Sequence, residues 1–403
     1  MLARWLIPAC LFTVLPAPQA YAYSVLSHEA IIDAAWDVAI KPILLQRFPD
    51  ASEDDLRKAH GYSYGGAIVQ DMGYYPFGSH LFSDLVHYIR SGDFIVNELA
   101  DSQDLDEFAF ALGSLAHYAA DNEGHPVAVN RAVPMLYRKV RKKFGKVATY
   151  EDSPADHLKV EFSFDVAEVA ENHYAPQSYH DFIGFEVSKP LLERAFQKTY
   201  GLPLKDVIPT IDLALGTYRH TAASIIPEMT RVAWQAKKKD LLRDTPGTTK
   251  RSFVYAISRS SYEKEWNTNY SKPGLWARFL SFLFRIVPKV GPFRALSFRA
   301  PTPQTQKLFM DSFVDALKVY REQLAVIRRQ EMLLLPDTNF DTGGPSKFGT
   351  YRLADEACAK LLIKLDEQKS DVPADLRQSL LDFYGNNMPA EPKAAEALAR
   401  LRQ

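Results

Sequence analysis

The stretch that most constrains this chain is an apolar helical run that leads directly into a histidine–aspartate–histidine series. His117, Asp121 and His125 follow one another at intervals of four residues, so on a helix they share one face, one turn apart. Imidazole nitrogen and carboxylate oxygen are ligands that zinc takes in proteins. Gly124 and Pro126 predict that the helix ends close to His125. Taken alone, the series fits a metal site and an ordinary polar surface stripe equally well.

Composition and patterning favour a globular, all-α protein. The chain has 403 residues, of which 47% are hydrophobic and 24% charged, enough for one large domain or two ordinary ones. Apolar residues recur at helical spacing, with no convincing strand, no internal repeat and no nucleotide-binding glycine loop. A formal net charge of -1 argues against general electrostatic attraction to nucleic acid, so we expect no specific nucleic-acid partner.

The N-terminus has the pattern of a secretory signal peptide. Arg4 precedes a short apolar core, and residues 20–22 fit a small-x-small cleavage site. The core is shorter than the roughly 20 apolar residues that a membrane span needs. Cleavage of residues 1–22 would make Tyr23 the first residue and leave Cys358 as the only cysteine. We therefore expect an exported protein, periplasmic or secreted, without an internal disulfide.

A second pair of candidate ligands repeats the spacing of the first. Ser153 and Pro154 predict the start of a helix, on which His157 and Glu161 are again four residues apart and share a face. This second pair makes a chance arrangement of polar residues less plausible.

Two more candidates precede the central series. His28 lies near the start of a helix predicted from residue 23 to 48, with Ser27 as its N-cap. Asp71 lies in the glycine- and tyrosine-rich segment 61–78, which predicts a loop with short turns.

Two histidines, His80 and His87, lie seven residues apart on a helix predicted from residue 80 to 89. With His80 included, the candidates are too many for one four-coordinate zinc and suit a cluster of two or three ions. The full set consists of five imidazoles, three carboxylates and one main-chain amine, namely His28, His80, His117, His125, His157, Asp71, Asp121, Glu161 and the terminus at Tyr23.

This constellation resembles the zinc-dependent phospholipase C superfamily, which also includes fungal single-strand nucleases and the catalytic domain of glycosylphosphatidylinositol-specific phospholipase D. A new terminus followed by His28 is similar to the nuclease branch. Segments 66–71, 86–90 and 117–121 look more like the glycosylphosphatidylinositol phospholipase branch. The resemblance covers about residues 23–170. It implies a phospholipase C/nuclease-like helical bundle with a trinuclear zinc site. We expect a catalytic domain over residues 23–240, followed by a helical C-terminal extension of unknown role over residues 241–403.

The resemblance implies three zinc ions. The first would be held by Asp71, His80, His117 and Asp121. The second would be held by His125, His157 and Glu161. The third would be held by Asp121, His28 and the amino nitrogen and carbonyl oxygen of Tyr23, which stands where the family usually has tryptophan.

Two further residue roles follow from the resemblance. Asp71 would orient or deprotonate the attacking water, as its family counterpart is thought to do. His87 lies one helical turn beyond the expected ligand position, so it would be a supporting or structural histidine rather than a ligand.

The implied activity is that of an exported zinc phosphodiesterase that hydrolyses phospholipid head-group phosphodiester bonds with metal-activated water. Two alternatives remain open. A single-strand-type nuclease of the same fold would need an aromatic base-stacking cleft, which Tyr62, Tyr64, Tyr74 and Tyr75 would provide. A non-catalytic, zinc-stabilised binding protein would need fewer ions than this ligand set suggests.

Two segments carry unusual charge. Residues 137–146 contain six cations in ten positions, which is typical of a solvated helix face and also of a patch that attracts phosphate or a membrane surface. Residues 274–299 combine aromatic and aliphatic bulk with five cations and no acidic residue. This second segment fits either buried helix packing or contact with a membrane surface.

Overall fold

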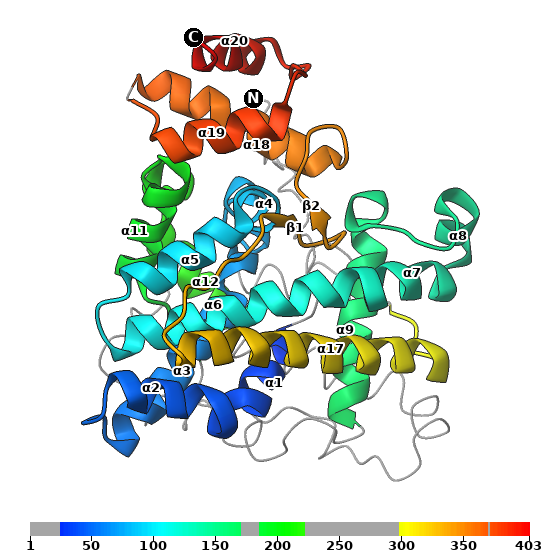
Figure 1. Ribbon diagram of the computed structural model, residues 1–403. Helices are drawn as coiled ribbons and strands as arrows, with labels where there is room; N and C mark the ends of the chain where they lie inside the picture. Colours follow the sequence, from blue (N-terminus) through cyan, green and yellow to red (C-terminus); the bar gives the residue numbers. More distant parts are fainter. Residues whose placement is uncertain (1–24, 171–184, 222–297, 370) are drawn as a thin grey trace, which may run out of the picture.

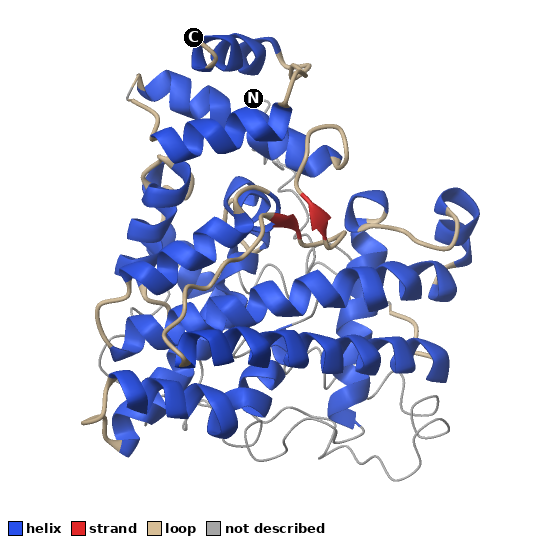
Figure 2. Cartoon of the chain, viewed as in Figure 1, coloured by secondary structure: helices blue, strands red, loops and turns tan. Residues whose placement is uncertain are grey.

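Helices dominate the architecture. The structure is a computed structural model that describes residues 25–170, 185–221, 298–369 and 371–403 (Figures 1 and 2). Within these ranges the strands are limited to β1 (Thr338–Asn339) and β2 (Gly344–Pro345), which pair antiparallel. The all-α expectation is confirmed. The signal peptide, Tyr23, the 240/241 boundary and residues 274–297 lie outside the described residues.

The first half of the chain supplies most of the helices that surround the site. In chain order these are α1 (Val25–Ala35), η1 (Trp36–Ile40), α2 (Lys41–Arg47), α3 (Glu53–Val69), η2 (Gln70–Tyr74), α4 (His80–Tyr88), α5 (Ser91–Asp101), α6 (Leu105–Glu123), η3 (Gly124–Val129), α7 (Asn130–Leu136), α8 (Arg138–Phe144), η4 (Tyr150–Asp152) and α9 (Pro154–Ala170). The predicted start at Pro154 is confirmed. Ser27 lies inside α1, so its prediction as an N-cap is wrong.

The remaining helices cover the periphery and the C-terminal side (Figure 1). They are α11 (Lys189–Tyr200), η5 (Leu204–Asp206), α12 (Ile211–His220), α17 (Pro303–Arg328), α18 (Arg352–Gln368), α19 (Ala374–Tyr384) and α20 (Pro392–Leu401). Helix α17 packs along α6, and α18 packs on α4. One cluster of buried apolar side chains extends from Val25 in α1 to Leu398 in α20.

Helices α3 and α6 pack extensively against each other, and glycines permit their close approach. A Cβ atom on Gly66 would lie 1.9 Å from the Phe110 carbonyl oxygen, and one on Gly113 would lie 2.0 Å from the Ser63 carbonyl oxygen. The glycine-rich segment 61–78 was predicted as a loop with short turns, but residues 61–69 form the end of α3. The short turns follow, as the 3₁₀ turn η2 and residues 75–78. Burial against α6 outweighs the low helix propensity of these glycines.

Helix α6 ends at Glu123, directly before Gly124, so its predicted end close to His125 is confirmed. The chain nevertheless stays helical, because it continues as the π-helical turn η3 and then as α7. A π turn inserts an additional residue per turn, so side chains that follow it rotate away from the preceding stripe. His125 lies within this turn, and its ligand atom groups with those of His157 and Asp341.

None of the described helices combines the length and the apolar character needed to cross a membrane.

Candidate metal centre

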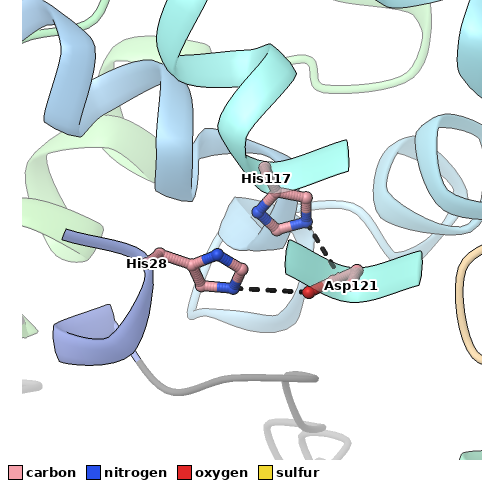
Figure 3. Close-up of side chains that lie close together, drawn as sticks. All are labelled: His28, His117 and Asp121. Carbon is pink, nitrogen blue, oxygen red and sulfur yellow. Dashed lines mark ion pairs between the residues drawn. The ribbon is translucent and has the colours of Figure 1, made fainter. Parts of the chain in front are cut away.

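Two histidines and one carboxylate from α1 and α6 meet in the interior (Figure 3). Asp121 Oδ1 lies 3.5 Å from His28 Nε2, and Asp121 Oδ2 lies 3.2 Å from His117 Nε2. The rings of His28 and His117 stack with their centroids 4.3 Å apart. All three side chains are fully buried. The four-residue spacing of His117 and Asp121 thus places both on the inward face of α6.

Asp71 and His87 enter the same cluster from η2 and α4. His87 Nε2 lies 3.3 Å from Asp71 Oδ1 and 3.5 Å from Asp121 Oδ2. The ligand atoms of Asp71, His87 and His117 lie within 4.8 Å of one another. The same holds for His28, His117 and Asp121. Five buried groups therefore converge, with His117 common to both sets.

Backbone carbonyl groups fix the tautomers of the two adjacent histidines. His117 Nδ1 donates to the Ala67 carbonyl and His87 Nδ1 donates to the Ser83 carbonyl, each at 2.8 Å. The Nε2 atoms of His117 and His87 then face each other at 3.2 Å. Two nitrogen lone pairs at this distance repel unless a proton or a cation lies between them.

The electrostatics of the first cluster also favour a cation. Burial alone would lower the pKa of His87, but its interactions with Asp121 and Asp71 outweigh burial and raise that pKa to about 10. Burial raises the pKa of Asp71. Burial opposes ionisation of Asp121 as well, but His117 and His87 hold its pKa well below the usual range. A proton on His87 thus balances buried carboxylate charge, and a divalent metal ion would replace that proton.

A second group forms where η3, α9 and the β1–β2 turn meet. The ligand atoms of His125, His157 and Asp341 lie within 4.8 Å of one another, and His125 Nδ1 is 3.0 Å from Asp341 Oδ1. His157 Nε2 donates to the Ala148 carbonyl at 2.7 Å, which leaves Nδ1 as the acceptor nitrogen. Burial lowers the pKa of His125 to about 3 and that of His157 to about 4. Both rings are therefore neutral at pH 7, as metal ligands must be.

Asp341 was not among the sequence-predicted ligands. Its Oδ2 accepts hydrogen bonds from the Tyr150 backbone nitrogen at 2.8 Å and the Tyr351 hydroxyl at 2.6 Å, while Oδ1 is the atom near His125. Burial raises the pKa of Asp341 to about 7. The only sequence signal for it is its position in the glycine-rich turn 339–346, and no spacing relates that turn to the histidines.

Two predicted ligands lie at the margin of these groups. Glu161 is buried, and its Oε1 lies 3.7 Å from His157 Nδ1. His80 is only partly buried at the start of α4, where its ring centroid is 5.7 Å from that of Tyr74. Seven helical residues separate His80 from His87, or about 10 Å along the axis, so the two cannot reach the same ion. The structure places His87, and not His80, in the cluster.

The tyrosines considered for base stacking do not form an open cleft. Tyr64, Tyr74 and Tyr75 are buried, and the Tyr64 hydroxyl donates to Asp33. The ring of Tyr75 packs against Tyr218 with the centroids 4.3 Å apart. These three side chains belong to the core and offer no face to a base, whereas Tyr62 is partly exposed.

The donor set fits zinc. Buried imidazole nitrogens and carboxylate oxygens converge. In His117, His87, His157 and Asp341 the second nitrogen or oxygen is held by a backbone group or a hydroxyl, in the manner that orients metal ligands. Neighbouring metal ions in such a site can activate water and stabilise the charge of a phosphate undergoing substitution.

Comparison with known protein families agrees with this geometry. The family model described as zinc-dependent phospholipase C matches residues 27–208, a range that contains every candidate ligand except Tyr23 and Asp341. No curated protein and no solved structure matches the chain. Residues 27–208 thus match the zinc-dependent phospholipase C family, which supports the resemblance seen in the sequence.

Proposed function

We propose that this protein hydrolyses the head-group phosphodiester bond of a phospholipid with zinc-activated water. The observation that carries the proposal is the convergence of eight buried imidazole and carboxylate groups in two neighbouring clusters, namely His28, Asp71, His87, His117, Asp121, His125, His157 and Asp341. The match to the zinc-dependent phospholipase C family supports zinc as the metal and a phosphodiester as the substrate.

We propose three zinc ions with a revised set of ligands. The first would be held by Asp71, His87, His117 and Asp121. The second would be held by His125, His157 and Asp341, with Glu161 alongside. The third would be held by His28, Asp121 and the terminus at Tyr23. His117 can serve one ion only, because its Nδ1 proton is engaged with the Ala67 carbonyl.

The protein side chains have distinct tasks in this proposal. Bound zinc would lower the pKa of water to about 7 and offset the negative charge of the phosphate. Asp71 would orient the attacking water and accept its proton at a carboxylate oxygen. Asp121, which faces His28, His87 and His117, would hold the ligands in one compact array. No serine or cysteine nucleophile is needed.

The burial of Tyr64, Tyr74 and Tyr75 favours a lipid substrate over single-stranded nucleic acid. A nuclease of this kind would require exposed aromatic faces on which bases stack.

The direct test is to measure bound zinc by atomic absorption and to assay the mature protein on phosphatidylcholine, phosphatidylinositol and single-stranded DNA. We expect zinc-dependent head-group release from lipid, and a loss of at least a hundredfold in Asp71→Asn. Asp84→Asn is the matched control. Asp84 is also a buried carboxyl near the site, its pKa is raised to about 7 by burial, and it lies outside the ligand groups.

The zinc content of the variants separates two roles of Asp71. If Asp71→Asn is inactive but retains zinc, Asp71 acts in proton transfer. If the variant is inactive and has lost zinc, Asp71 is a metal ligand. Full activity in Asp71→Asn would remove the residue from the mechanism. Cleavage of DNA without hydrolysis of lipid would contradict the proposal and support the alternative function, a single-strand-type nuclease.

We also propose export with cleavage before Tyr23, supported by the signal-like residues 1–22. The amine of Tyr23 exists only after cleavage, so the third ion should bind only to the processed chain. A fusion that adds residues ahead of Tyr23 should bind one zinc fewer than the processed protein. Equal zinc content in the two proteins would refute ligation by the terminus.

A further inference from the structure

A strongly basic feature of the described surface is the α8 patch, defined here as the six cations on and just after α8. Its members are Arg138, Lys139, Arg141, Lys142, Lys143 and Lys146. All six side chains are exposed, and none forms an ion pair with a described carboxylate. The chain as a whole carries a net charge of only -1, so this concentration of positive charge is local.

Helix α8 separates apolar and basic residues cleanly. Val140 is buried, and Tyr137 and Phe144 are partly buried against the hydrophobic core. The intervening positions carry the cations, so the whole outer surface of the helix is basic. Two further cations, Arg299 and Lys159, lie over the ring of Tyr137 at 5.5 and 5.4 Å. An ordinary solvated helix mixes both signs of charge, which this one does not.

The α8 patch is attached to the metal centre. The Ala148 backbone nitrogen donates to the Asn130 carbonyl at 2.9 Å and closes the excursion that contains α8. The Ala148 carbonyl in turn accepts the hydrogen bond from His157 Nε2. The patch lies at the edge of the molecule (right-hand side of Figure 1) and is thus linked through one backbone group to a candidate ligand.

We propose that the α8 patch binds the surface of an anionic lipid bilayer. Clustered lysine and arginine side chains without acidic partners are attracted by the negative potential of such a surface. The link through Ala148 would place the second ligand group beside the bilayer. This proposal goes beyond the proposed hydrolysis, because surface binding requires no turnover.

The test is co-sedimentation of the full mature protein with vesicles, on ice, in low salt. Vesicles of phosphatidylcholine alone are compared with vesicles that contain phosphatidylserine. The test variant is Lys139→Gln/Lys142→Gln/Lys146→Gln. The control variant is Lys205→Gln/Lys318→Gln/Lys347→Gln, which removes three exposed lysines from other elements and changes the net charge equally.

Each cation near an anionic surface strengthens binding roughly fivefold, so we expect the test variant, which lacks three lysines, to bind roughly a hundredfold more weakly. The control variant should bind like the unmodified protein, and raised salt should release the protein. Hydrolysis of soluble dihexanoyl-phosphatidylcholine should be unchanged in both variants, since the patch residues lie outside the ligand groups. If the protein sediments with anionic vesicles but hydrolyses no lipid, the proposed function is refuted and the membrane proposal stands.

Three outcomes would overturn the membrane proposal. The first is equal binding to both kinds of vesicle. The second is an equal loss of binding in test and control variants. The third is that the protein sediments with no vesicle but binds a single-stranded oligonucleotide through the same lysines. That result would assign the patch to nucleic acid.

Discussion

At the scale of single residues, the site depends on which nitrogen of each histidine carries the proton. In His117 and His87 the Nδ1 proton is held by a backbone carbonyl, and in His157 the Nε2 proton is held in the same way. Each ring therefore turns one defined nitrogen to the interior as its possible ligand atom, Nε2 in His117 and His87 and Nδ1 in His157. This arrangement lowers the cost of ordering the ligands when a metal ion binds.

The first prediction distinguishes the roles of His80 and His87, the two histidines of α4. His87→Ala should lose zinc and at least a hundredfold in activity, because it removes a nitrogen that faces Asp71, Asp121 and His117. His80→Ala should retain zinc and most of the activity. Zinc content and head-group release, measured side by side on the two proteins, check this prediction. The opposite pattern would restore His80 as the ligand.

A buried acid outside the site makes stability depend on pH. Glu98 in α5 is fully buried, and no described cation lies within ion-pair distance. Burial raises its pKa to about 8, and the Ser114 hydroxyl offsets only part of that rise. The folded protein therefore keeps this proton up to about pH 8, whereas the unfolded chain releases it near pH 4.5. The free energy of unfolding falls as pH rises through this window.

The second prediction concerns Glu98→Gln. The substitution removes the ionisable group, so the variant should match the parent protein near pH 5 and become more stable than it near pH 8. We expect a difference on the order of 2–4 kcal/mol at the higher pH. Urea unfolding of both proteins at pH 5 and pH 8 measures it. Equal pH dependence in the two proteins would show that Glu98 is ionised in the folded state.

Residue spacing could predict only the local part of the site. The pairs His117–Asp121 and His157–Glu161 were identifiable because a helix brings residues four apart onto one face. The choice of His87 over His80 depends on how α4 lies against α6, which no spacing within α4 determines. Asp341 is brought to His125 by tertiary packing of a distant turn.

At the scale of elements, the pair α3 and α6 positions the first ligand group. Helix α6 carries His117 and Asp121, whereas α3 supplies the Ala67 carbonyl that holds His117 and leads directly to Asp71. The backbones approach closely because Gly66 has no side chain to separate them. The distance between the two helices and the geometry of the ligands are therefore coupled.

The third prediction tests this coupling with alanine at two helical glycines. In Gly66→Ala the new Cβ would lie 1.9 Å from the Phe110 carbonyl oxygen, so the helices must separate. We expect a loss of about 1–3 kcal/mol or more in unfolding free energy, together with reduced zinc binding. Gly216→Ala in α12 is the control, because no atom of the described residues lies within 4 Å of its added Cβ. It should be neutral or stabilising by up to ~1 kcal/mol.

Thermal unfolding and zinc content measured on both glycine variants give the comparison. Gly66→Ala with unchanged zinc content would mean that the ligand geometry tolerates a change in helix separation.

Element types were largely predictable, but the backbone conformation beside the ligands was only partly so. The sequence correctly indicated α4, α6 and α9. Local residue preference failed at residues 61–69, where burial overrides glycine, and it did not indicate that the chain stays helical as η3 after α6 ends. Both features lie beside ligands. Sites of this kind often contain a local irregularity that turns a side chain towards a ligand.

At the scale of the whole molecule, the C-terminal region completes a site that begins in the N-terminal half. Its turn brings Asp341 to His125, and α17 packs on α6 and η3. Arg90, which joins α4 to α5, donates to Asp375 at 2.7 Å and to the Thr199 carbonyl at 2.9 Å. The sequence indicated only further helices of unknown role here. Their function in closing the second ligand group depends on contacts between parts of the chain that no local pattern relates.

The last prediction follows from this closure. If zinc joins His125, His157 and Asp341, its removal leaves a buried acid facing two buried imidazoles without the cation that links them. Chelation should then lower the melting temperature by several degrees, since a ligand bound only by the folded state stabilises that state. It should also increase amide hydrogen exchange at both η3 and the β1–β2 turn.

The measurement is hydrogen exchange by mass spectrometry on the zinc-loaded and chelated proteins, with Asp341→Asn alongside. The variant should exchange rapidly at the β1–β2 turn whether or not zinc is present, because Asp341 is the carboxylate through which that turn meets His125 and His157 in the second ligand group. Helix α20, which is distant from the ligands in Figure 1, should exchange equally in all samples. Unchanged exchange at the turn on chelation, with loss of protection around His117 and Asp121, would confine zinc to the first cluster. Asp341 would then be a structural partner of His125 and not a ligand.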